Sequence, residues 1–349
     1  MRPDLAGATG YIRNCWYVAG RSEDIGRTLT PVRMLGDDIV IFRTADGTPA
    51  ALEDACPHRK LPLSRGTLEG DHVVCGYHGL TFDRTGGCVI APTQLDNPPR
   101  RAAVQSYPAE DRWGFVWLWM GPADQADPRQ IIDIPNFDNP AWGKTPKGGL
   151  SMACHYLYII DNLLDPSHVA WVHLTSFAGV GTDNSPMTIE DLQDGVVVSR
   201  WIHDEPPPPY YRDMLPFGPT CDRKQHYECR LPATAINMSV YTPAGEGGAD
   251  RPLSPNAFIN ISYNFITPVD ETTTRYFWFQ HRNMHAEDHV LSQAMFEGAT
   301  AAFKEDQDVL ERVQTGMAQR RSGYLNLALD AGAMRFRTRV AKAIEGEQS

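Results

Sequence analysis

The 349-residue sequence lacks any run of 18 or more apolar residues, and its first twenty residues lack the apolar stretch of a secretion signal. These absences predict a protein that does not enter a membrane, and we expect it in the cytoplasm. Basic residues are also few, because 43 Asp and Glu outnumber 32 Lys and Arg for a formal charge of −11. Nucleic-acid binding needs clustered positive charge, so the composition argues against a nucleic-acid partner.

Two further absences concern redox chemistry. The seven cysteines are an odd number in a chain without a secretion signal. We therefore predict that they serve as metal ligands or buried thiols and do not form a disulfide framework. The glycine-rich fingerprint of a dinucleotide-binding turn is missing, as is a flavin motif. Electrons, if the protein uses them, are therefore expected from a separate protein.

Turn signals and residue spacing divide the chain into two predicted domains. Residues 10–120 contain short β-branched runs with Asp46-Gly47 and Gly86-Gly87 at hairpin turns, which predicts an all-β domain. A polar, proline-bearing connector follows at about 120–148. Residues 121–349 then combine a helical segment, several strand-like runs, and helices expected at 286–316 and 330–345. The prediction is an α+β protein whose second domain is an antiparallel sheet covered by helices.

Two cysteine–histidine pairs stand within the first domain, Cys56-x-His58 and Cys75-x-x-His78. A structural zinc site usually takes C-x2-4-C pairs that close on one tetrahedral ion. Here each pair offers one thiolate and one imidazole, and a single residue separates the first two. Two thiolates on one iron and two imidazoles on the other form a Rieske 2Fe–2S centre. The spacing favours this cluster over a zinc clip.

A second cluster of polar residues lies in an apolar segment, IIDNLLDPSHVAWVH at 159–173. Buried polar groups need partners or a metal, and this segment holds Asn162, Asp165, His168 and His173. On a straight helix the two histidines would point about 140° apart. Pro166 disfavours helical geometry at the residue before it and interrupts the hydrogen-bond ladder. We therefore predict a bent segment on which both imidazoles converge.

The third ligand of such a site is expected on the late helix. A ferrous oxygenase site uses two histidines and one carboxylate. In TAAFKEDQDVLERVQTG, Asp306 falls within the apolar stripe, where a carboxylate is costly unless it is paired or binds metal. Four charged residues are predicted to face away from the stripe: Glu305, Asp308, Glu311 and Arg312. His168, His173 and Asp306 are thus the predicted iron ligands, against the alternative of core histidines and a salt-bridged acid.

These motifs occur together with RNCWYVAG at 13–20, DNLLDPSHVAWVH and FKEDQDVLE. In this order the chain resembles the Rieske non-haem iron aromatic oxygenases over nearly its whole length. Within them it is most similar to the vanillate and dicamba O-demethylases and toluenesulfonate methyl-monooxygenase. The resemblance implies a Rieske domain, a catalytic domain with a helix-grip-like sheet, and a homotrimer in which one subunit's cluster faces its neighbour's iron.

The resemblance also implies roles for individual residues. Asp165 matches the family's bridging acid, which would join His168 of its own iron to a neighbour's His78, and Asn162 matches a position close to the iron. The catalytic sheet and its loops supply the substrate pocket in this family. The candidate wall positions on that basis are Asn237, Asn264, Trp278 and Phe296.

The function implied is that of a terminal oxygenase in aromatic catabolism. A separate NAD(P)H-dependent reductase of flavin or ferredoxin type would feed the cluster, and mononuclear Fe(II) would use O2 to hydroxylate a small aromatic acid. O-demethylation of a vanillate-like methoxybenzoate with formaldehyde release is the first expectation. Aryl-methyl or ring hydroxylation of toluenesulfonate- or phthalate-like compounds is the alternative. A Rieske electron carrier without oxygenase activity, or a zinc-stabilised binding protein, is a more distant one.

Overall fold

The computed structural model describes residues 10–92, 94, 101–179, 181, 185–319 and 325–348. The chain forms two compact units. The N-terminal unit comprises Gly10–Ile134 with Thr267–Asp270, and the C-terminal unit comprises Pro135–Ile266 with Glu271–Ser349. Residues 121–134, which the sequence assigns to the second domain, thus pack with the first unit. Across the described residues, none of the helices has the length and apolar character needed to cross a bilayer.

The N-terminal unit is built from three small antiparallel sheets. The first sheet contains β1 (Trp16–Arg21), β11 (Phe115–Trp119) and β10 (Ala109–Arg112). The second contains β2 (Thr30–Met34), β3 (Asp37–Arg43), β4 (Pro49–Glu53) and β9 (Ser106–Tyr107). The third contains β5 (Thr67–Glu69), β6 (His72–Val74), β7 (Thr81–Phe82) and β8 (Cys88–Ile90). Short 3-10 helices lie at Ser22–Asp24, Leu63–Arg65, Ala123–Gln125 and Pro128–Gln130.

Both hairpins predicted in this unit form where the sequence places their turns. Gly47 joins β3 to β4 with a φ of +87°, and Gly86 joins β7 to β8 with a φ of +84°. A Cβ at Gly86 would also meet the Val104 carbonyl oxygen at 2.0 Å, so this turn requires glycine for two reasons. The loop that carries Cys75 and His78 directly precedes β7, the first strand of this second hairpin.

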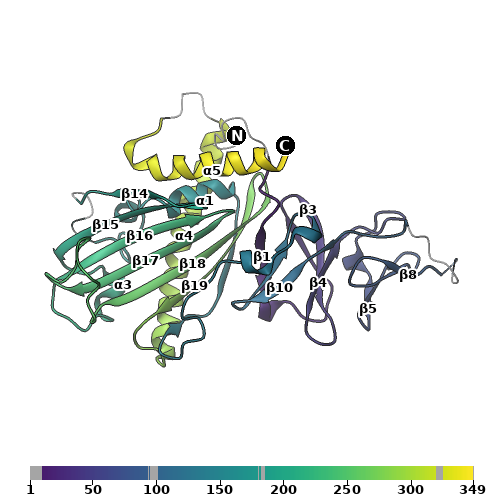
Figure 1. Cartoon of the computed structure of the whole chain (residues 1–349), viewed down its shortest axis with the longest axis horizontal. Coiled ribbons are helices and arrows are strands. Elements are labelled where there is room, and N and C mark those ends of the chain that lie inside the picture. Colours follow the sequence, from purple (N-terminus) through teal and green to yellow (C-terminus); the bar gives the residue numbers. More distant parts are fainter. Residues whose placement is uncertain are drawn as a thin grey trace. The chain divides into compact units, whose positions relative to one another are not determined.

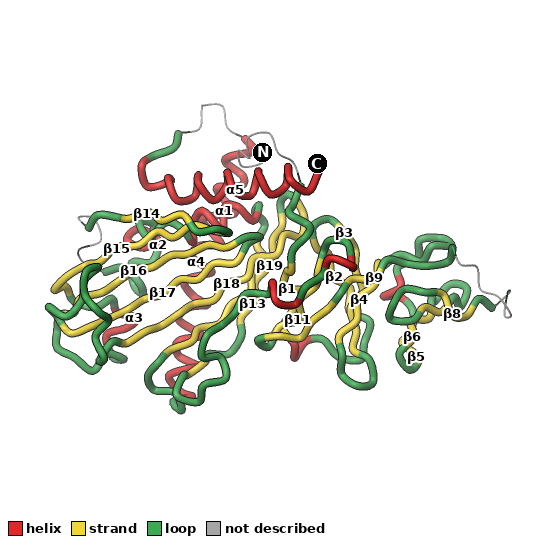
Figure 2. The backbone as a smooth tube through the Cα atoms, viewed as in Figure 1, coloured by secondary structure: helices red, strands yellow, loops and turns green. Residues whose placement is uncertain are grey.

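The C-terminal unit is one eight-stranded antiparallel sheet in the order β12-β19-β18-β17-β16-β15-β14, with β13 also paired to β19. Figure 2 shows its long strands running side by side. Their bounds are β12 Gly143–Lys144, β13 Gly148–Met152, β14 Thr188–Asp191, β15 Gly195–Glu205, β16 Cys221–Arg230, β17 Thr234–Pro243, β18 Phe258–Asp270 and β19 Thr273–Arg282. The helices are α1 (Tyr156–Leu163), α2 (Val169–Val172), α3 (Pro209–Arg212), α4 (His289–Gln319) and α5 (Ala331–Gln348), with a 3-10 turn at Ala328–Asp330.

Helices cover one face of this sheet, as Figure 1 shows. Helix α1 packs on β16 and β17, α4 on β13 and β19, and α5 on β15, while α1 also contacts both α4 and α5. On the opposite face, the segment before β12 covers β19, where Phe137 meets Phe279 edge to face and Trp142 packs on His281. This layering confirms the predicted α+β class and leaves a covered face on which a buried site can form.

A buried acid ties down the tip between β17 and β18. Asp222, 1% exposed, accepts hydrogen bonds of 2.9 Å from the backbone N–H groups of Asp204, Gly245 and Gly247. Burial alone would raise the pKa of Asp222, but these backbone donors outweigh it and the pKa is lowered. The loop at one end of the sheet therefore depends on an ionised carboxylate.

Candidate functional site

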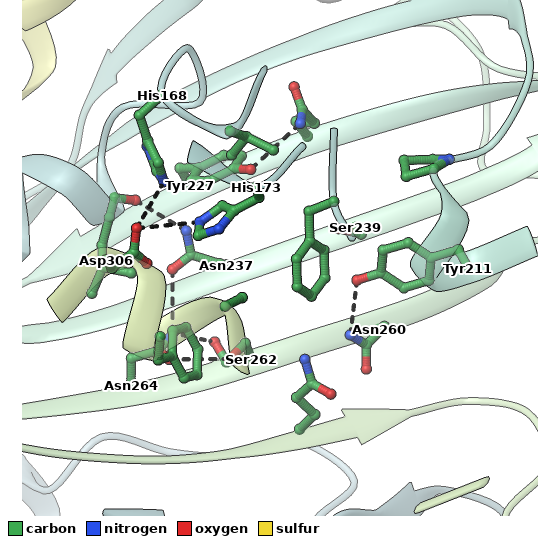
Figure 3. A pocket seen from close by; sticks show the side chains of 18 of the residues that line it. His168, His173, Tyr211, Tyr227, Asn237, Ser239, Asn260, Ser262, Asn264 and Asp306 are labelled. Carbon is green, nitrogen blue, oxygen red and sulfur yellow. Dashed lines mark hydrogen bonds and ion pairs between the residues drawn. The ribbon is translucent and has the colours of Figure 1, made fainter. Parts of the chain in front are cut away.

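Two histidines and an aspartate from separate elements meet on the covered face of the sheet. One atom of each of His168, His173 and Asp306 can be chosen so that all three lie within 4.8 Å of one another. The Asp306 carboxylate oxygen Oδ1 lies 3.2 Å from His173 Nε2 and 3.7 Å from His168 Nε2. Figure 3 shows both imidazoles pointing at that carboxylate.

The bend predicted at Pro166 is what brings the histidines together. Helix α1 ends at Leu163, and α2 begins only at Val169, after the proline. His168 directly precedes the one-turn helix and His173 directly follows it, in a conformation with φ −102° and ψ 48°. The two imidazoles thus leave opposite ends of a single turn and can converge.

The other ring nitrogen of each histidine is held by a neighbour. The Nδ1–H of His168 donates to the backbone carbonyl of Asp165, and the Nδ1–H of His173 donates to Glu305 Oε2 at 2.8 Å. Partners of this kind fix the orientation of a metal-binding imidazole and leave its Nε2 free to bind an ion. Both Nε2 atoms face the same point beside Asp306.

Asp306 is a buried carboxylate supported by a neutral donor. It lies on the buried face of α4, is 4% exposed, and its Oδ1 accepts a 2.9 Å hydrogen bond from Asn162 Nδ2. Among the described residues no Lys or Arg forms an ion pair with it. A carboxylate buried without a cationic partner is costly, and a bound cation removes that cost.

The protonation preferences of the two histidines differ. Burial lowers the pKa of His168, and the positive charge that His173 can carry lowers it further, so the net shift is downward despite Asp306. Burial also acts to lower the pKa of His173, but hydrogen bonds and charges from Asp306 and Glu305 raise it overall. Two imidazoles and one carboxylate, each oriented by a neighbour, form the facial donor set that suits non-haem Fe(II).

A cavity of about 100 Å³ opens beside this triad. All three triad residues line it, as do Asn237 and Asn264 from the sheet. The remaining walls mix apolar side chains with uncharged polar groups: Leu163, Val169, Phe177, Pro208, Tyr211, Gln225, Tyr227, Ser239, Tyr241, Asn260, Ser262, Gln280, Ala302 and Phe303. A substrate in this cavity would lie directly against the metal-binding atoms.

The four residues of the Cys–His motif converge in the N-terminal unit. Cys56 and Cys75 are each 2% exposed, and the Nδ1 atoms of His58 and His78 face one another at 3.1 Å. Burial raises the pKa of the Cys56 thiol, and the adjacent Cys75 raises it further. Two buried sulfurs and two facing imidazole nitrogens, without a carboxylate among them, fit a 2Fe–2S cluster with mixed ligands.

The two loops that carry these ligands share one backbone pattern. Each cysteine N–H donates to the carbonyl five residues later, Leu61 or Leu80, and each cysteine carbonyl accepts from the residue four positions on. That fourth residue has a positive φ in both loops, 59° at Lys60 and 72° at Gly79. The same type of turn therefore presents both cysteines, although the histidines follow them at different spacings.

Comparison with known proteins places both regions in one family. Residues 15–108 match the family described as Rieske [2Fe-2S] domain, and residues 152–346 match the vanillate O-demethylase oxygenase C-terminal domain. The chain belongs to the Rieske non-haem iron oxygenases. The 2Fe–2S cluster and a mononuclear non-haem iron are accordingly the cofactors of this oxygenase, with O2 as co-substrate.

Individual relatives of this Rieske oxygenase align over nearly their full lengths. The putative toluene-4-sulfonate monooxygenase system iron-sulfur subunit of Comamonas testosteroni is 33% identical, over 96% of this chain and 98% of the relative. The vanillate O-demethylase oxygenase subunit of Pseudomonas sp. strain HR199 is 33% identical over 96% of each chain. A crystal structure of dicamba monooxygenase bound to 3,6-dichlorosalicylic acid has a TM-score of 0.89 at 26% identity, covering 98% and 100% of the two chains.

Two of the four candidate wall residues of the oxygenase lie away from the cavity. Trp278 is 1% exposed and packs against Phe296 and Phe303, and neither Trp278 nor Phe296 lines the cavity. The indole of Trp278 also lies across Gly148 on the paired strand, where a Cβ would meet it at 2.1 Å. Trp278 is therefore part of the core beneath the site.

The expected orientation of several acids is corrected by the structure. Glu305 and Glu311, predicted to face away from the buried stripe of α4, reach His173 and the backbone N–H of Ala153 respectively. The carboxylate of Asp165 accepts from the Ser167 backbone N–H, and only its main-chain carbonyl contacts His168. Glu305 is the residue that the sequence reasoning missed; its position immediately before Asp306 was the available signal.

Proposed function

We propose that this oxygenase component hydroxylates a small aromatic substrate, first of all by O-demethylation of a methoxy-substituted ring. The observation that carries the proposal is the triad of His168, His173 and Asp306 on the wall of a cavity of about 100 Å³. The names of relatives that demethylate vanillate and dicamba support it. A methoxybenzoate is the first compound to test.

The protein residues have separate tasks in this reaction. His168, His173 and Asp306 would hold the iron, which when bound supplies activation of O2 with electrons delivered through the cluster. Asn162 and Glu305 orient the ligands, and the apolar walls exclude water. Insertion of one oxygen atom into the methyl C–H bond gives a hemiacetal, which releases a phenol and formaldehyde while the second oxygen atom leaves as water.

Electron supply requires partners. We infer a separate NAD(P)H-dependent reductase that reduces the cluster, because relatives are named as oxygenase components. We also infer a homotrimer in which Asp165 of one subunit bridges His168 to the cluster ligand His78 of the next. The main-chain carbonyl of Asp165 already accepts from His168 Nδ1, and its carboxylate accepting from His78 would complete a short hydrogen-bonded path for electrons.

The experiment is oxygen uptake with formaldehyde release across methoxy- and methyl-substituted aromatic compounds, using a surrogate reductase. Equal amounts of oxygen consumed and formaldehyde formed from a methoxy compound are expected. Oxygen uptake without formaldehyde from any methoxy compound contradicts O-demethylation.

Hydroxylation of an aryl methyl group is the second candidate, favoured by the similarity to the toluene-4-sulfonate monooxygenase subunit. It predicts a benzyl alcohol product from methyl-substituted rings. An electron carrier, by contrast, would bind two irons per chain rather than three, which iron analysis of the purified protein decides.

A further inference from the structure

The floor of the cavity is organised in rows of uncharged polar side chains. Gln225, Ser239 and Asn260 pair across β16, β17 and β18, and all three line the cavity. On β18, Asn260 precedes Asn264 by four residues, which at 3.3 Å per residue separates the two positions by about 13 Å. Figure 3 shows Asn260 and Tyr211 at the end of the pocket away from the triad, and we call this row with Tyr211 the distal end.

Most hydrogen-bond donors of the floor already have acceptors in the protein. The side-chain amide of Gln225 donates to the Tyr227 hydroxyl, and that of Asn260 donates to the Tyr211 hydroxyl. The amides of Asn237 and Asn264 donate to the main-chain carbonyls of Leu163 and Ala235, respectively. Asn260 Oδ1, in contrast, is buried and has no hydrogen-bond partner among the described residues. An unpaired buried acceptor on a cavity wall calls for a donor on the bound molecule.

The described part of the cavity wall offers no permanently charged cation. No described residue that lines the cavity is Lys or Arg. Arg200 lies behind the floor, where its guanidinium donates to Gln225 Oε1 at 2.7 Å and to the Pro166 carbonyl at 3.1 Å. At the metal end, the two charges of Fe(II) are formally matched by the carboxylates of Asp306 and Glu305. A carboxylate or sulfonate entering the distal end would therefore lose its hydration without gaining a cation.

We propose that the distal end recognises an uncharged hydrogen-bond donor on the substrate, a hydroxyl or N–H group, through Asn260 Oδ1. The inference rests on the proposed hydroxylation of a small aromatic compound, and for this chain it replaces the acid group expected from the resemblance. The substrate class becomes neutral methoxy-aromatic alcohols, phenols or amides.

The first test compares two ligands of nearly equal size without a phenolic hydroxyl, 3-methoxybenzyl alcohol and 3-methoxybenzoate. Binding to the iron-loaded holoenzyme is measured by titration calorimetry without oxygen, so that turnover does not interfere. We expect the alcohol to bind at least tenfold more tightly than the acid. Equal or tighter binding of the acid overturns the proposal.

Two substitutions isolate the acceptor. Asn260→Leu removes it, whereas Asn260→Asp keeps an oxygen acceptor, and both lose the amide donor to Tyr211. The Leu variant should bind the benzyl alcohol about tenfold more weakly and the matched toluene without a hydroxyl, 3-methoxytoluene, as before, while the Asp variant keeps the wild-type affinity for the alcohol within about threefold. Melting temperature and cluster absorbance establish that both variants are folded. Equal losses for alcohol and toluene in the Leu variant contradict the assignment.

A buried arginine provides the opposing control. Arg223 pairs with Tyr241 in the register of β16 and β17 and is 1% exposed, yet it does not line the cavity. If Arg223→Met abolishes a preference for the acid, the anchor is this guanidinium and the proposal is wrong. Formaldehyde assays on both ligands distinguish failure of this inference from failure of the proposed O-demethylation. Demethylation of the acid alone contradicts only the recognition of an uncharged donor. Tight binding of the alcohol without formaldehyde from any ligand contradicts only the proposed O-demethylation.

Discussion

Replacement of Glu305 by Gln should weaken iron binding without removing any iron ligand. Glu305 Oε2 accepts from His173 Nδ1 at 2.8 Å, and its side chain is 40% exposed. A charge-assisted hydrogen bond contributes about 1.5–3 kcal/mol and a neutral one about 0.5–1.5 kcal/mol. The amide keeps an acceptor but loses the charge, and solvent reduces the difference at this exposure to about 1 kcal/mol. The expected loss of metal affinity is thus about five- to tenfold, near the lower limit for residues that orient metal ligands.

The assay is titration of protein stripped of its mononuclear iron, with the cluster intact, using Co(II) as a spectroscopic probe and Fe(II) as competitor. Asp308→Asn is the matched control, because Asp308 lies on the same helix but pairs with Arg312 at 63% side-chain exposure. The control should retain wild-type affinity within about twofold. An unchanged affinity in Glu305→Gln, or an equal loss in Asp308→Asn, would refute the reasoning.

Three further predictions follow from the same geometry. Asp306→Ala should lose the mononuclear iron and turnover while keeping the visible absorption of the cluster; iron analysis that still gives three irons per chain contradicts the ligand set. Asp165→Asn should retain both metal centres but slow cluster oxidation in a single turnover, and an unchanged rate rules out the bridging role. Asp222→Ala removes the acceptor of three backbone N–H groups, of which that of Gly247 is buried, and should cost about 1–3 kcal/mol in calorimetric unfolding at pH 7. Because the folded pKa of Asp222 is lowered, its contribution is present above about pH 4 and is lost as pH falls through the folded pKa, so the two proteins should converge in stability in acid. A difference that persists there contradicts this account.

The sequence predicts the parts of the site that depend on local spacing. The Cys–His pairs and the break at Pro166 are encoded within short segments, so their consequences follow without knowledge of the rest of the fold. Helix α4 is also found close to its predicted bounds, at His289–Gln319 instead of 286–316.

Some contacts between segments distant in the chain could not be predicted from the sequence. The helical spacing of α4 places Glu305 off its apolar stripe, but His173 emerges from another element to meet it. Similarly, strand alternation puts Trp278 on the same face as Gln280, yet Phe303 and Gly148 cover the indole, and only Gln280 reaches the cavity. Which side chain is covered depends on the register between strands and on how the helices pack on the sheet, and the sequence of a single segment determines neither.

A metal ion bound by the triad would also affect the stability of the fold. Its ligands come from the turn around α2 and from the middle of α4, segments more than a hundred residues apart in the chain. An ion bound there acts as a crosslink between a helix and the loop it covers, and its binding energy adds to the stability of the folded unit. At an iron concentration one hundred times the dissociation constant, the gain would be about 2.7 kcal/mol. Iron supply would therefore govern how long the C-terminal unit survives heat or proteolysis, independently of how fast the enzyme turns over.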